Sequence, residues 1–398
     1  MSYPPDKDSF SISSLLAHPN RRSHQLQDRF SLRMGSITET HLIESQMPDD
    51  EAYLFATELV SMSIPTMTLM VAFELDLLEI IKKAGSGKTM SAAEVVSHLP
   101  TTNPEAPRMV DRILRLLATY SVVTCRLETS ADGKVERRYG LAPVCKYMTK
   151  DKDGVSLAAI DRFVQSKIVM QTWYSLKDSI LEGGNPWKKT HKESLFEQLS
   201  KDPIYDRIFN TAMHDNTKIV VQKLLENYKG FQNINSLVDV GGGFGSALKM
   251  IISKYPHIKG INYDQPHVVA KAPAYPGVEH VGGDMFVSIP RADAIFMKGI
   301  CHDWNDEMSV KVLKNCYDAL PENGKVIMVE YVVPELADNS VENKVLFIID
   351  TFLMTQSDGG RERTEEEWNV LAKKAGFEEV EVACKAFCSR AIEIIKRR

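Results

Sequence analysis

The chain changes its hydrophobic pattern near residue 235. Before that point, apolar residues recur every three or four positions, as in "APRMVDRILRLLATY" (106–120), and this spacing predicts amphipathic helices. Beyond it, short apolar runs alternate with helical segments: "SLVDV", "GINYD", "VEHVGGDMF", "DAIFMKG" and "GKVIMVEYVV". Because this alternation is typical of a parallel sheet with helices on both faces, the second part predicts an α/β fold.

The first part predicts helices followed by a β-hairpin. Residues 49–84 are expected to be helical with a break or kink at Pro65, and residues 90–99 to form a short helix. The segments "VVTCRLE" and "VERRYGLA" flank the turn "ADGK" and indicate a hairpin. Residues 157–227 are expected to be helical again, around the loop "EGGNPW". Helices with a hairpin resemble a winged-helix unit, which either binds DNA or serves packing and dimerisation.

Composition favours packing over DNA binding. The chain has 398 residues, of which 43% are hydrophobic, enough for two or three domains with a large core. Its net charge is -5, so Arg108, Arg112 and Arg115 are expected on a solvated face rather than on DNA. No apolar run approaches the roughly 20 residues of a membrane span. The six cysteines form no CxxC pair, which disfavours zinc and redox sites and favours reduced thiols in the cytoplasm.

Residues 1–45 are expected to form a disordered N-terminal extension. The first 33 residues are rich in Ser and Arg, as in an organelle transit peptide, but Asp6, Asp8 and Asp28 count against one. Their polarity favours a disordered tail. Met34 offers a second possible start of translation.

A glycine-rich segment, "LVDVGGGFGSALKM", lies between a predicted strand and a predicted helix. Gly241, Gly243 and Gly245 would let the backbone turn tightly and approach a ligand closely. A dinucleotide site would have its third glycine where Ser246 stands. The G-x-G-x-G spacing is compatible with an amino-acid–nucleoside ligand that has no pyrophosphate.

Acidic residues follow the next two predicted strands. Asp264 ends "GINYD" and could accept hydrogen bonds from both ribose hydroxyls. Asp284 ends "GGD" and could accept one from an adenine amino group. Either residue could instead cap a helix. Because the glycines and both acids stand at consecutive strand ends, the pattern favours a nucleoside site.

A histidine and two glutamates stand near the ends of later elements. His302, in "FMKGICHDWNDE", follows the fourth strand, Glu330 closes the fifth, and Glu362 precedes the last helix. A histidine can accept a proton near neutral pH, and a carboxylate behind it fixes its tautomer. The three residues therefore predict a general base, although "HDWNDE" could also be the solvated start of a helix.

Taken together, these motifs resemble the plant caffeate/flavonoid type of S-adenosylmethionine-dependent O-methyltransferase. The resemblance runs from about residue 51 to the C-terminus. It is carried by "LDLLEII", "LPTTNPEAPRMVDRILRLLA", "LVDVGGG", "KYPHIKGINYDQPHVV", "YPGVEHVGGDMF", "MKGICHDWND", "LKNCYDALPENGKV" and "GGRERT".

The resemblance implies a Rossmann-like methyltransferase domain at residues 156–398 and a helical, winged-helix dimerisation domain at residues 46–155. It also implies S-adenosyl-L-methionine as cofactor, a small phenolic acceptor and a cytoplasmic homodimer, without a metal, nucleic acid or membrane. His302 would be the base, held by Glu330 and Glu362. The cofactor contacts would be Gly241, Gly243, Asp264, Asp284, Met285 and Lys298.

The presumed acceptor pocket departs from the caffeate-type pattern. Gly299 stands in place of the Trp of "MKWICHDW", Phe163 and Val164 in place of a Met–Asn pair, and Asn216 in place of a His. The changes are either neutral or indicate an acceptor other than caffeate, larger or less hydroxylated. The expected acceptor-binding residues are Phe163, Phe209, Met213, Asn216, Ile349, Phe352 and Leu353.

Three functions therefore remain open. The first is O-methylation of a phenol, which His302 and the glutamates favour. The second is N-methylation of an aromatic amine or heteroaromatic acid, which needs a base less. The third is a catalytically silent dimer partner or a DNA-binding protein, which the intact motifs and the acidic net charge disfavour.

Overall fold

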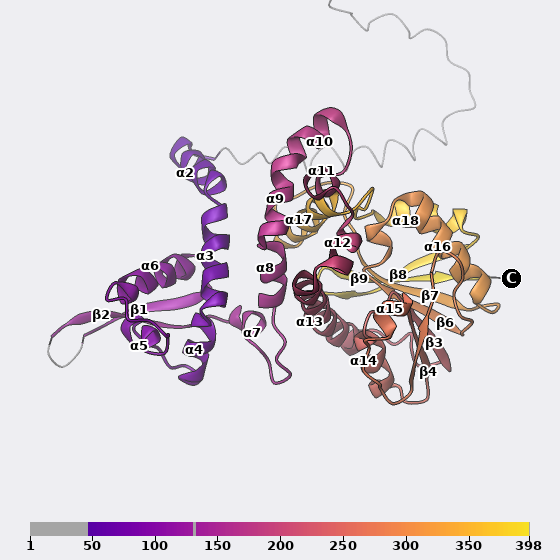
Figure 1. Ribbon diagram of the computed structural model, residues 1–398, viewed down its shortest axis with the longest axis horizontal. Coiled ribbons are helices and arrows are strands. Elements are labelled where there is room, and N and C mark those ends of the chain that lie inside the picture. The colour runs from indigo at the N-terminus through magenta and orange to yellow at the C-terminus, as the bar shows by residue number, and fades with distance from the viewer. Residues whose placement is uncertain (1–46, 130–132, 398) are drawn as a thin grey trace, which may run out of the picture. The chain divides into compact units, whose positions relative to one another are not determined.

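The computed structural model describes residues 47–129 and 133–397 and is shown in Figure 1. The chain divides into two compact units, Met1–Ser63 and Ile64–Arg398. The predicted extension of residues 1–45 lies outside the described residues. The domain boundaries expected at 45/46 and 155/156 stay predictions.

The helical N-terminal stretch is broken earlier than its proline suggested. Helix α2 (Asp49–Val60) ends before residues 61 and 62, and α3 (Ser63–Glu74) begins next. Pro65 lies in the first turn of α3. The backbone N–H groups of a first turn have no partner within the helix, so a proline is tolerated there. The expected break at Pro65 was therefore wrong. Among the described helices, none is long and apolar enough on its own to cross a membrane; α2 and α3 meet that test only as a pair.

The next elements form the predicted helices and hairpin around one apolar core. This core contains Leu77, Leu114 and Tyr139, all with no exposed surface. Strands β1 and β2 are antiparallel, with Val123 opposite Leu141. The elements are α4 (Leu77–Lys83), α5 (Ala92–Val96), α6 (Ala106–Thr119), β1 (Val123–Thr129), β2 (Val135–Leu141) and α7 (Cys145–Met148).

Acidic residues accompany the arginines of this region. Arg108 on α6 pairs with Glu105 at 2.7 Å, and Arg137 on β2 pairs with Asp111 at 3.1 Å. A nucleic-acid surface needs unopposed positive charge. The pairing of Arg108 is compatible with a solvated face, and the expectation that Arg108, Arg112 and Arg115 do not contact DNA stays a prediction.

A series of helices connects the hairpin region to the sheet. Phe163 is buried at its centre and contacts the rings of Tyr205 and Phe209, with centroids 6.0 and 5.4 Å away. The helices are α8 (Ala158–Val164), α9 (Lys167–Thr172), α10 (Leu176–Glu182), α11 (Pro186–His191), α12 (Leu195–Lys201) and α13 (Pro203–Asn227), with a short 3-10 turn, η1 (Trp173–Ser175), after α9.

The remaining chain forms a seven-stranded sheet in the order β5-β4-β3-β6-β7-β9-β8. The five predicted strands are parallel, as expected, and β8 and β9 add an antiparallel edge that was not predicted. The strands are β3 (Ser236–Val240), β4 (Lys259–Asp264), β5 (Val278–Gly282), β6 (Ala294–Lys298), β7 (Lys325–Tyr331), β8 (Glu379–Ala386) and β9 (Ser389–Ile395).

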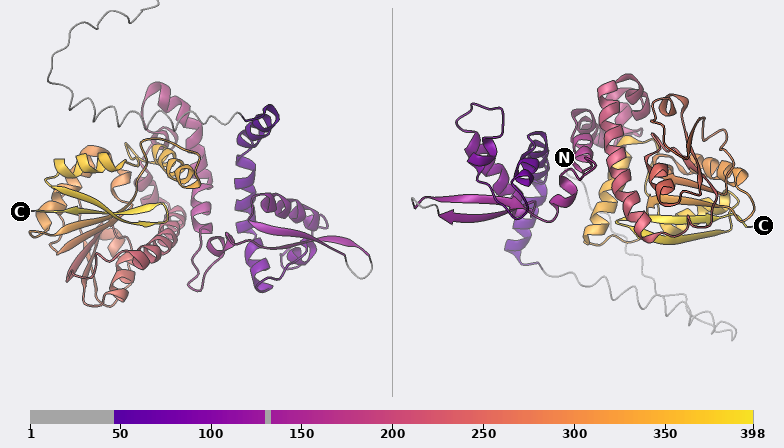
Figure 2. Two further views of the ribbon diagram at one scale, coloured as in Figure 1. Left: turned by 180° about the vertical axis from the view of Figure 1, so that it is seen from behind. Right: turned by 90° about the horizontal axis from the view of Figure 1, so that it is seen from below.

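Helices cover both faces of this sheet, so the predicted α/β fold is confirmed (Figure 2). One core lies under α16 and α18 and includes Leu313 and Trp368; the other lies under α13 and α14 and includes Leu224 and Leu248. The helices and turns are α14 (Ser246–Lys254), α15 (Pro266–Val269), η2 (Cys301–Asp303), α16 (Asp306–Ala319), α17 (Val341–Gln356) and α18 (Glu365–Lys374).

Strand order places two predicted motifs side by side. β3 pairs with β4 on one side and with β6 on the other, so the strands after β3 are added first on one side of it and then on the other, while all of them stay parallel. Loops diverge at such a point and leave a crevice at the carboxyl ends of the strands. The glycine loop after β3 and the His302 loop after β6 both emerge at this crevice.

Candidate active site

The glycine loop is closed on its sheet side and open on the other. Gly241, Gly243 and Gly245 all have left-handed φ angles, of +67°, +56° and +79°, which favour glycine. A Cβ at Gly242 would lie 2.1 Å from Oδ1 of Asn262, whereas a Cβ at Gly243 would have no atom within 4 Å. The loop therefore leaves a side of its backbone accessible to a ligand.

The two predicted acids lie next to this loop, but they differ in setting. Asp264 ends β4, and its carboxylate accepts hydrogen bonds from the amides of Gly243 at 2.8 Å and Gln265 at 2.7 Å. β5 ends at Gly282, so Asp284 does not end a strand as predicted; it lies in the following turn and accepts from the amide of Phe286 at 2.9 Å. The alternative that either acid caps a helix was wrong, because α15 has its N-cap at Gln265 and a turn follows Asp284; both carboxylates keep lone pairs for a ligand.

Charged groups are buried beneath the loop. Burial and the charge of Asp264 raise the pKa of Asp239 to about 8. Burial lowers the pKa of Lys298, while Glu330 and Asp239 oppose that shift. Among the described residues, Oδ2 of Asp239 and Oδ1 of the fully buried Asn262 have no hydrogen-bond partner. Asn262 was not predicted, because an asparagine inside an apolar strand carries no motif.

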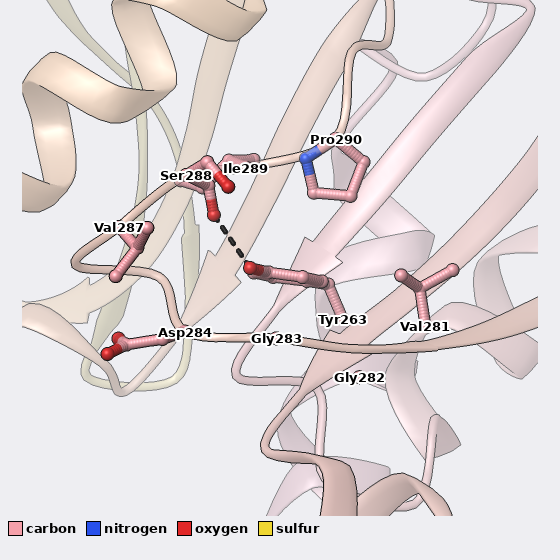
Figure 3. A pocket seen from close by; sticks show the side chains of 9 residues that line it. All are labelled: Tyr263, Val281, Gly282, Gly283, Asp284, Val287, Ser288, Ile289 and Pro290. Carbon is pink, nitrogen blue, oxygen red and sulfur yellow. Dashed lines mark hydrogen bonds between the residues drawn. The ribbon is translucent and has the colours of Figure 1, made fainter.

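A hollow of about 460 Å³ opens beside the Asp284 turn (Figure 3). Its wall includes Tyr263, Val281 and Pro290, and the Tyr263 hydroxyl donates to the Ser288 carbonyl oxygen at 2.7 Å. Asp284 lines this hollow, while its carboxylate points away from the Tyr263 ring. The hollow extends the crevice edge past the end of β5.

These features fit S-adenosylmethionine. Its ribose has two hydroxyl donors, for which Asp264 retains acceptor capacity, and its adenine has an amino donor, for which Asp284 does. Met285 is half-buried beside Asp284, and its carbonyl oxygen accepts from Asn315 at 2.7 Å. The open backbone at Gly243 leaves room for the rest of the molecule.

His302 lies across the crevice from the glycine loop, in the 3-10 turn that follows β6. Its Nδ1–H donates to Oε1 of Glu362 at 2.8 Å, and Oε2 of Glu330 lies 4.0 Å from the same nitrogen. Both glutamate side chains have no exposed surface, and that of His302 is 15% exposed. Helix α16 starts later, at Asp306, and is capped by Asn305. This is not the geometry of a solvated histidine at a helix start.

Backbone amides hold Glu330 in place. Its Oε1 accepts from the amides of Ile300 at 3.0 Å and Cys301 at 3.1 Å. Burial raises the pKa of Glu330 to about 7; the charge of Glu362 acts in the same direction, and His302 and the two amides act against it. One glutamate thus anchors the loop that carries the histidine, while the other bonds to the imidazole.

The carboxylates determine the charge of His302. Burial by itself lowers the pKa of His302, but the charges of Glu362, Asp303 and Glu330 outweigh it and raise the pKa to about 10. In the protein alone, the imidazole is therefore protonated at neutral pH. A positive charge brought close to the ring would lower this pKa again.

His302, Glu330 and Glu362 could also ligate a metal, because one ligand atom from each lies within 4.8 Å of the others. An imidazole with two carboxylates is a donor set that zinc accepts. In this arrangement, however, Nδ1 of His302 already donates its proton to Oε1 of Glu362, and Oε1 of Glu330 already accepts from two backbone amides. The absence of a metal stays a prediction.

The structure brings most of the predicted acceptor residues together. Rings of Phe209 and Phe352 lie 5.4 and 5.9 Å from that of Phe163, and Met213 packs against the same cluster. Leu353 is buried and Ile349 half-buried on α17, the helix that also carries Phe352.

Asn216 lies near a residue that sequence reasoning missed. Its side chain acts against burial, which raises the pKa of Tyr331, and the Tyr331 ring centroid lies 6.5 Å from that of His302. Trp304 was also missed; its ring packs edge-on against Phe286 at 4.7 Å. Tyr331 directly follows Glu330 and Trp304 stands two positions after His302, and only that proximity in the chain could have indicated them.

Comparison with known proteins gives consistent results. The family model of the O-methyltransferase domain matches residues 173–378 of this chain. The family model of the O-methyltransferase dimerisation domain matches residues 57–151. Caffeic acid 3-O-methyltransferase 1 of Populus tremuloides is 55% identical over 92% of this chain and 100% of its own length. The caffeic acid 3-O-methyltransferase of Medicago sativa is 52% identical over the same shares.

Solved structures share the fold. Human N-acetylserotonin methyltransferase in complex with SAM superposes with a TM-score of 0.75 at 19% identity, over 88% of this chain and 99% of that one. The structure of LaPhzM superposes with a TM-score of 0.69 at 25% identity, over 87% and 99%.

We expect Glu362→Gln to lower the pKa of His302 by about 1–3 units, because it removes a negative charge hydrogen-bonded to the ring. NMR titration of labelled histidine, with the signal assigned through His302→Gln, measures this shift. Glu307→Gln is the matched control, since this acid is exposed on the neighbouring first turn of α16. An unchanged pKa in Glu362→Gln would show that the two groups are not coupled.

Proposed function

The chain belongs to the O-methyltransferase family, whose members use S-adenosylmethionine, and on that premise we propose that His302 is the general base that activates a phenolic hydroxyl. The observation that carries the proposal is the 2.8 Å bond from Nδ1 to the buried Glu362. With Nδ1–H donated to a carboxylate, the neutral ring has its free lone pair on Nε2. That nitrogen faces the space beside Gly299.

The reaction needs a nucleophilic oxygen in line with the methyl group. When bound, S-adenosylmethionine supplies an electrophilic methyl carbon on a sulfonium. A phenol has a pKa of about 10 and is mostly neutral at pH 7. His302 takes the phenol proton on Nε2, a contribution of about 100-fold to 10,000-fold. Glu362 and Glu330 then stabilise the imidazolium, because both carboxylates lie within 4.0 Å of Nδ1.

The base must be neutral before it can act, although the carboxylates raise its pKa. The positive charge of a sulfonium, bound in the adjoining crevice, favours loss of the proton from His302. Base function is therefore expected mainly in the cofactor-bound enzyme. Turnover should rise with pH until His302 is fully deprotonated.

The acceptor is proposed to be a phenylpropanoid, flavonoid or related phenol. Relatives named for caffeic acid are 52–55% identical to this chain, which supports a phenylpropanoid-like acceptor. The side chains that pack around Phe163 are apolar. Few polar groups stand there for ring substituents, which supports an acceptor that is larger or less hydroxylated than caffeate.

N-methylation is the second candidate. An amine carries its own lone pair and needs no buried carboxylate–histidine pair. The retained pair therefore favours oxygen. A silent dimer partner is less consistent with a buried, hydrogen-bonded base beside an open glycine loop.

We expect labelled methyl transfer to at least one phenol, and a rate about 100-fold to 10,000-fold lower in His302→Ala. The panel is caffeate, 5-hydroxyferulate, quercetin, resveratrol, a coumarin, anthranilate and nicotinate. As a control, S-adenosylhomocysteine should raise the melting temperature of both proteins, because the substitution leaves the cofactor loop intact. Comparable turnover by His302→Ala would eliminate the base, and label only on nitrogen would favour the second candidate.

The chain carries a dimerisation domain, and we propose that it forms a homodimer. Large apolar side chains are exposed on several helices: Ile180 and Leu181 on α10, both 72% exposed, and Ile348 on α17, 67% exposed. On α2, Tyr53 and Leu54 are similarly exposed. Exposed apolar surface of this kind is typical of an interface.

Sedimentation analysis is expected to give twice the chain mass of 44.8 kDa. Ile348→Asp should weaken the dimer, because it places a charge in apolar contact surface. Val370→Asp on α18 is the control, as this residue is 41% exposed on a different helix. A wild-type monomer at micromolar concentration would refute the proposal.

Gly299 is proposed to decide which acceptors fit. A Cβ at this position would lie 3.3 Å from Nε2 of His302, so the glycine leaves space directly beside the reacting nitrogen. Its φ of +61° favours glycine, and its amide bonds to the Val329 carbonyl at 3.1 Å. The backbone is therefore held there, and the space is available for a substituent next to the reacting hydroxyl.

We expect Gly299→Ala to lower kcat/KM by about 10-fold or more for phenols with a bulky ortho substituent, and by less for unsubstituted phenols. Gly183→Ala is the control for backbone strain, because Gly183 has a φ of +80° and open space around its Cβ position. An equal loss on every acceptor would mean that strain, and not space, causes the effect.

A further inference from the structure

Arg363 is a fully buried arginine directly after Glu362. Its Nη1 donates to the carbonyl oxygen of Cys301 at 3.0 Å, and its Nη2 donates to that of Trp304 at 2.8 Å. Nε and Nη2 also donate to the Asp306 carboxylate, at 3.0 and 2.8 Å. One guanidinium thus joins three points of the loop that carries His302.

The neighbours of Arg363 hold the same loop. The amide of Arg361 donates to the His302 carbonyl oxygen at 2.9 Å, and Glu362 bonds to the imidazole. The carbonyl of Arg363 accepts from the amide of Val333 at 3.1 Å, just beyond β7, the strand that carries Glu330. The segments bearing His302, Glu362 and Glu330 are therefore connected through residues 361–363.

The loop itself offers its carbonyls few other partners. Residues 301–303 form a single 3-10 turn, in which the Cys301 carbonyl accepts from the Trp304 amide at 3.2 Å, whereas the Trp304 carbonyl accepts from no backbone amide of the described residues. The Ser309 hydroxyl reaches both oxygens, at 3.2 and 3.4 Å, but one hydroxyl proton cannot serve both. Arg363 donates to both at shorter distance.

The geometry of Arg363 is specific to a guanidinium. Its planar fork reaches two carbonyls and one carboxylate at once, whereas an ammonium would act as a point donor. The guanidinium also stacks on the Trp368 ring, 5.2 Å from its centroid. The guanidinium is thus held by the Trp368 ring and by its hydrogen bonds to the two carbonyls and the carboxylate.

We propose that Arg363 is a positioning residue that sets the direction of the His302 ring by fixing the backbone on both sides of it. It does not contact the acceptor or cofactor, and it acts through residues 301–304. A shift of about 1 Å in a catalytic group can reduce a rate roughly 100-fold. The proposal rests on the proposed role of His302 as far as turnover is concerned, while the ring position can be measured independently.

The test compares Arg363→Met with Arg361→Met in the full-length protein. Arg361 is the matched control, since its half-exposed side chain bonds to Asp306 and Glu367, reaches the Glu362 carbonyl oxygen only at 3.5 Å, and its backbone amide is unaffected. We expect Arg363→Met to lower kcat about 100-fold, with KM for S-adenosylmethionine changed less than threefold. Arg361→Met should stay within about threefold in both constants, because its guanidinium does not touch the 301–304 carbonyls.

Two further variants keep the test decisive if Arg363→Met fails to fold. Arg363→Lys keeps the charge and loses the fork, so it should fold and still show a reduced kcat with KM unchanged. Asp306→Asn keeps Arg363 bonded to both carbonyls and should retain most of the rate. Wild-type kcat in Arg363→Lys, or a loss carried by KM alone, would overturn the proposal.

An NMR measurement separates this proposal from the role of the base. The Nδ1 proton of His302, bonded to Glu362, gives a downfield signal that should shift or broaden in Arg363→Lys and stay unchanged in Arg361→Met. If His302→Ala keeps its turnover, the base proposal fails, and this signal alone decides whether Arg363 positions the ring. An unchanged signal in Arg363→Lys would refute the positioning role.

Discussion

The hydrogen bond between Nδ1 of His302 and Glu362 is the interaction on which the rest of this crevice depends. It joins residues 60 positions apart in the chain, and the carboxylate has no exposed surface. A buried carboxylate without a partner is costly, so the segment before α18 must lie against the loop after β6. This contact places the proton of the neutral ring on Nδ1 and leaves the lone pair on Nε2.

The same edge of the sheet concentrates other buried charge. Asp239, Lys298 and Glu330 end or nearly end three adjacent strands, and their charges act on one another. In such a setting a single added charge changes the protonation of its neighbours far more than it would in water. A crevice that receives a cationic cofactor next to a histidine of raised pKa can therefore couple binding to the release of a proton.

Glycine decides where a ligand can reach the backbone. Gly243 and Gly299 stand in loops after neighbouring strands, β3 and β6, and both have left-handed φ angles. A side chain at Gly243 would occupy the side of the loop open to a cofactor, and one at Gly299 would lie against Nε2 of His302.

The sequence by itself determined the alternation of strands and helices, the glycine loop and the group of His302, Glu330 and Glu362, because hydrophobic period and residue type are local properties. Tertiary structure decided the rest. The pairing of β9 with β7 and the approach of Asn216 to Tyr331 depend on contacts between distant segments. Arg363 shows the reason most clearly. The sequence gives its residue type, but only the packing of the folded chain determines that it bonds to the carbonyls of Cys301 and Trp304.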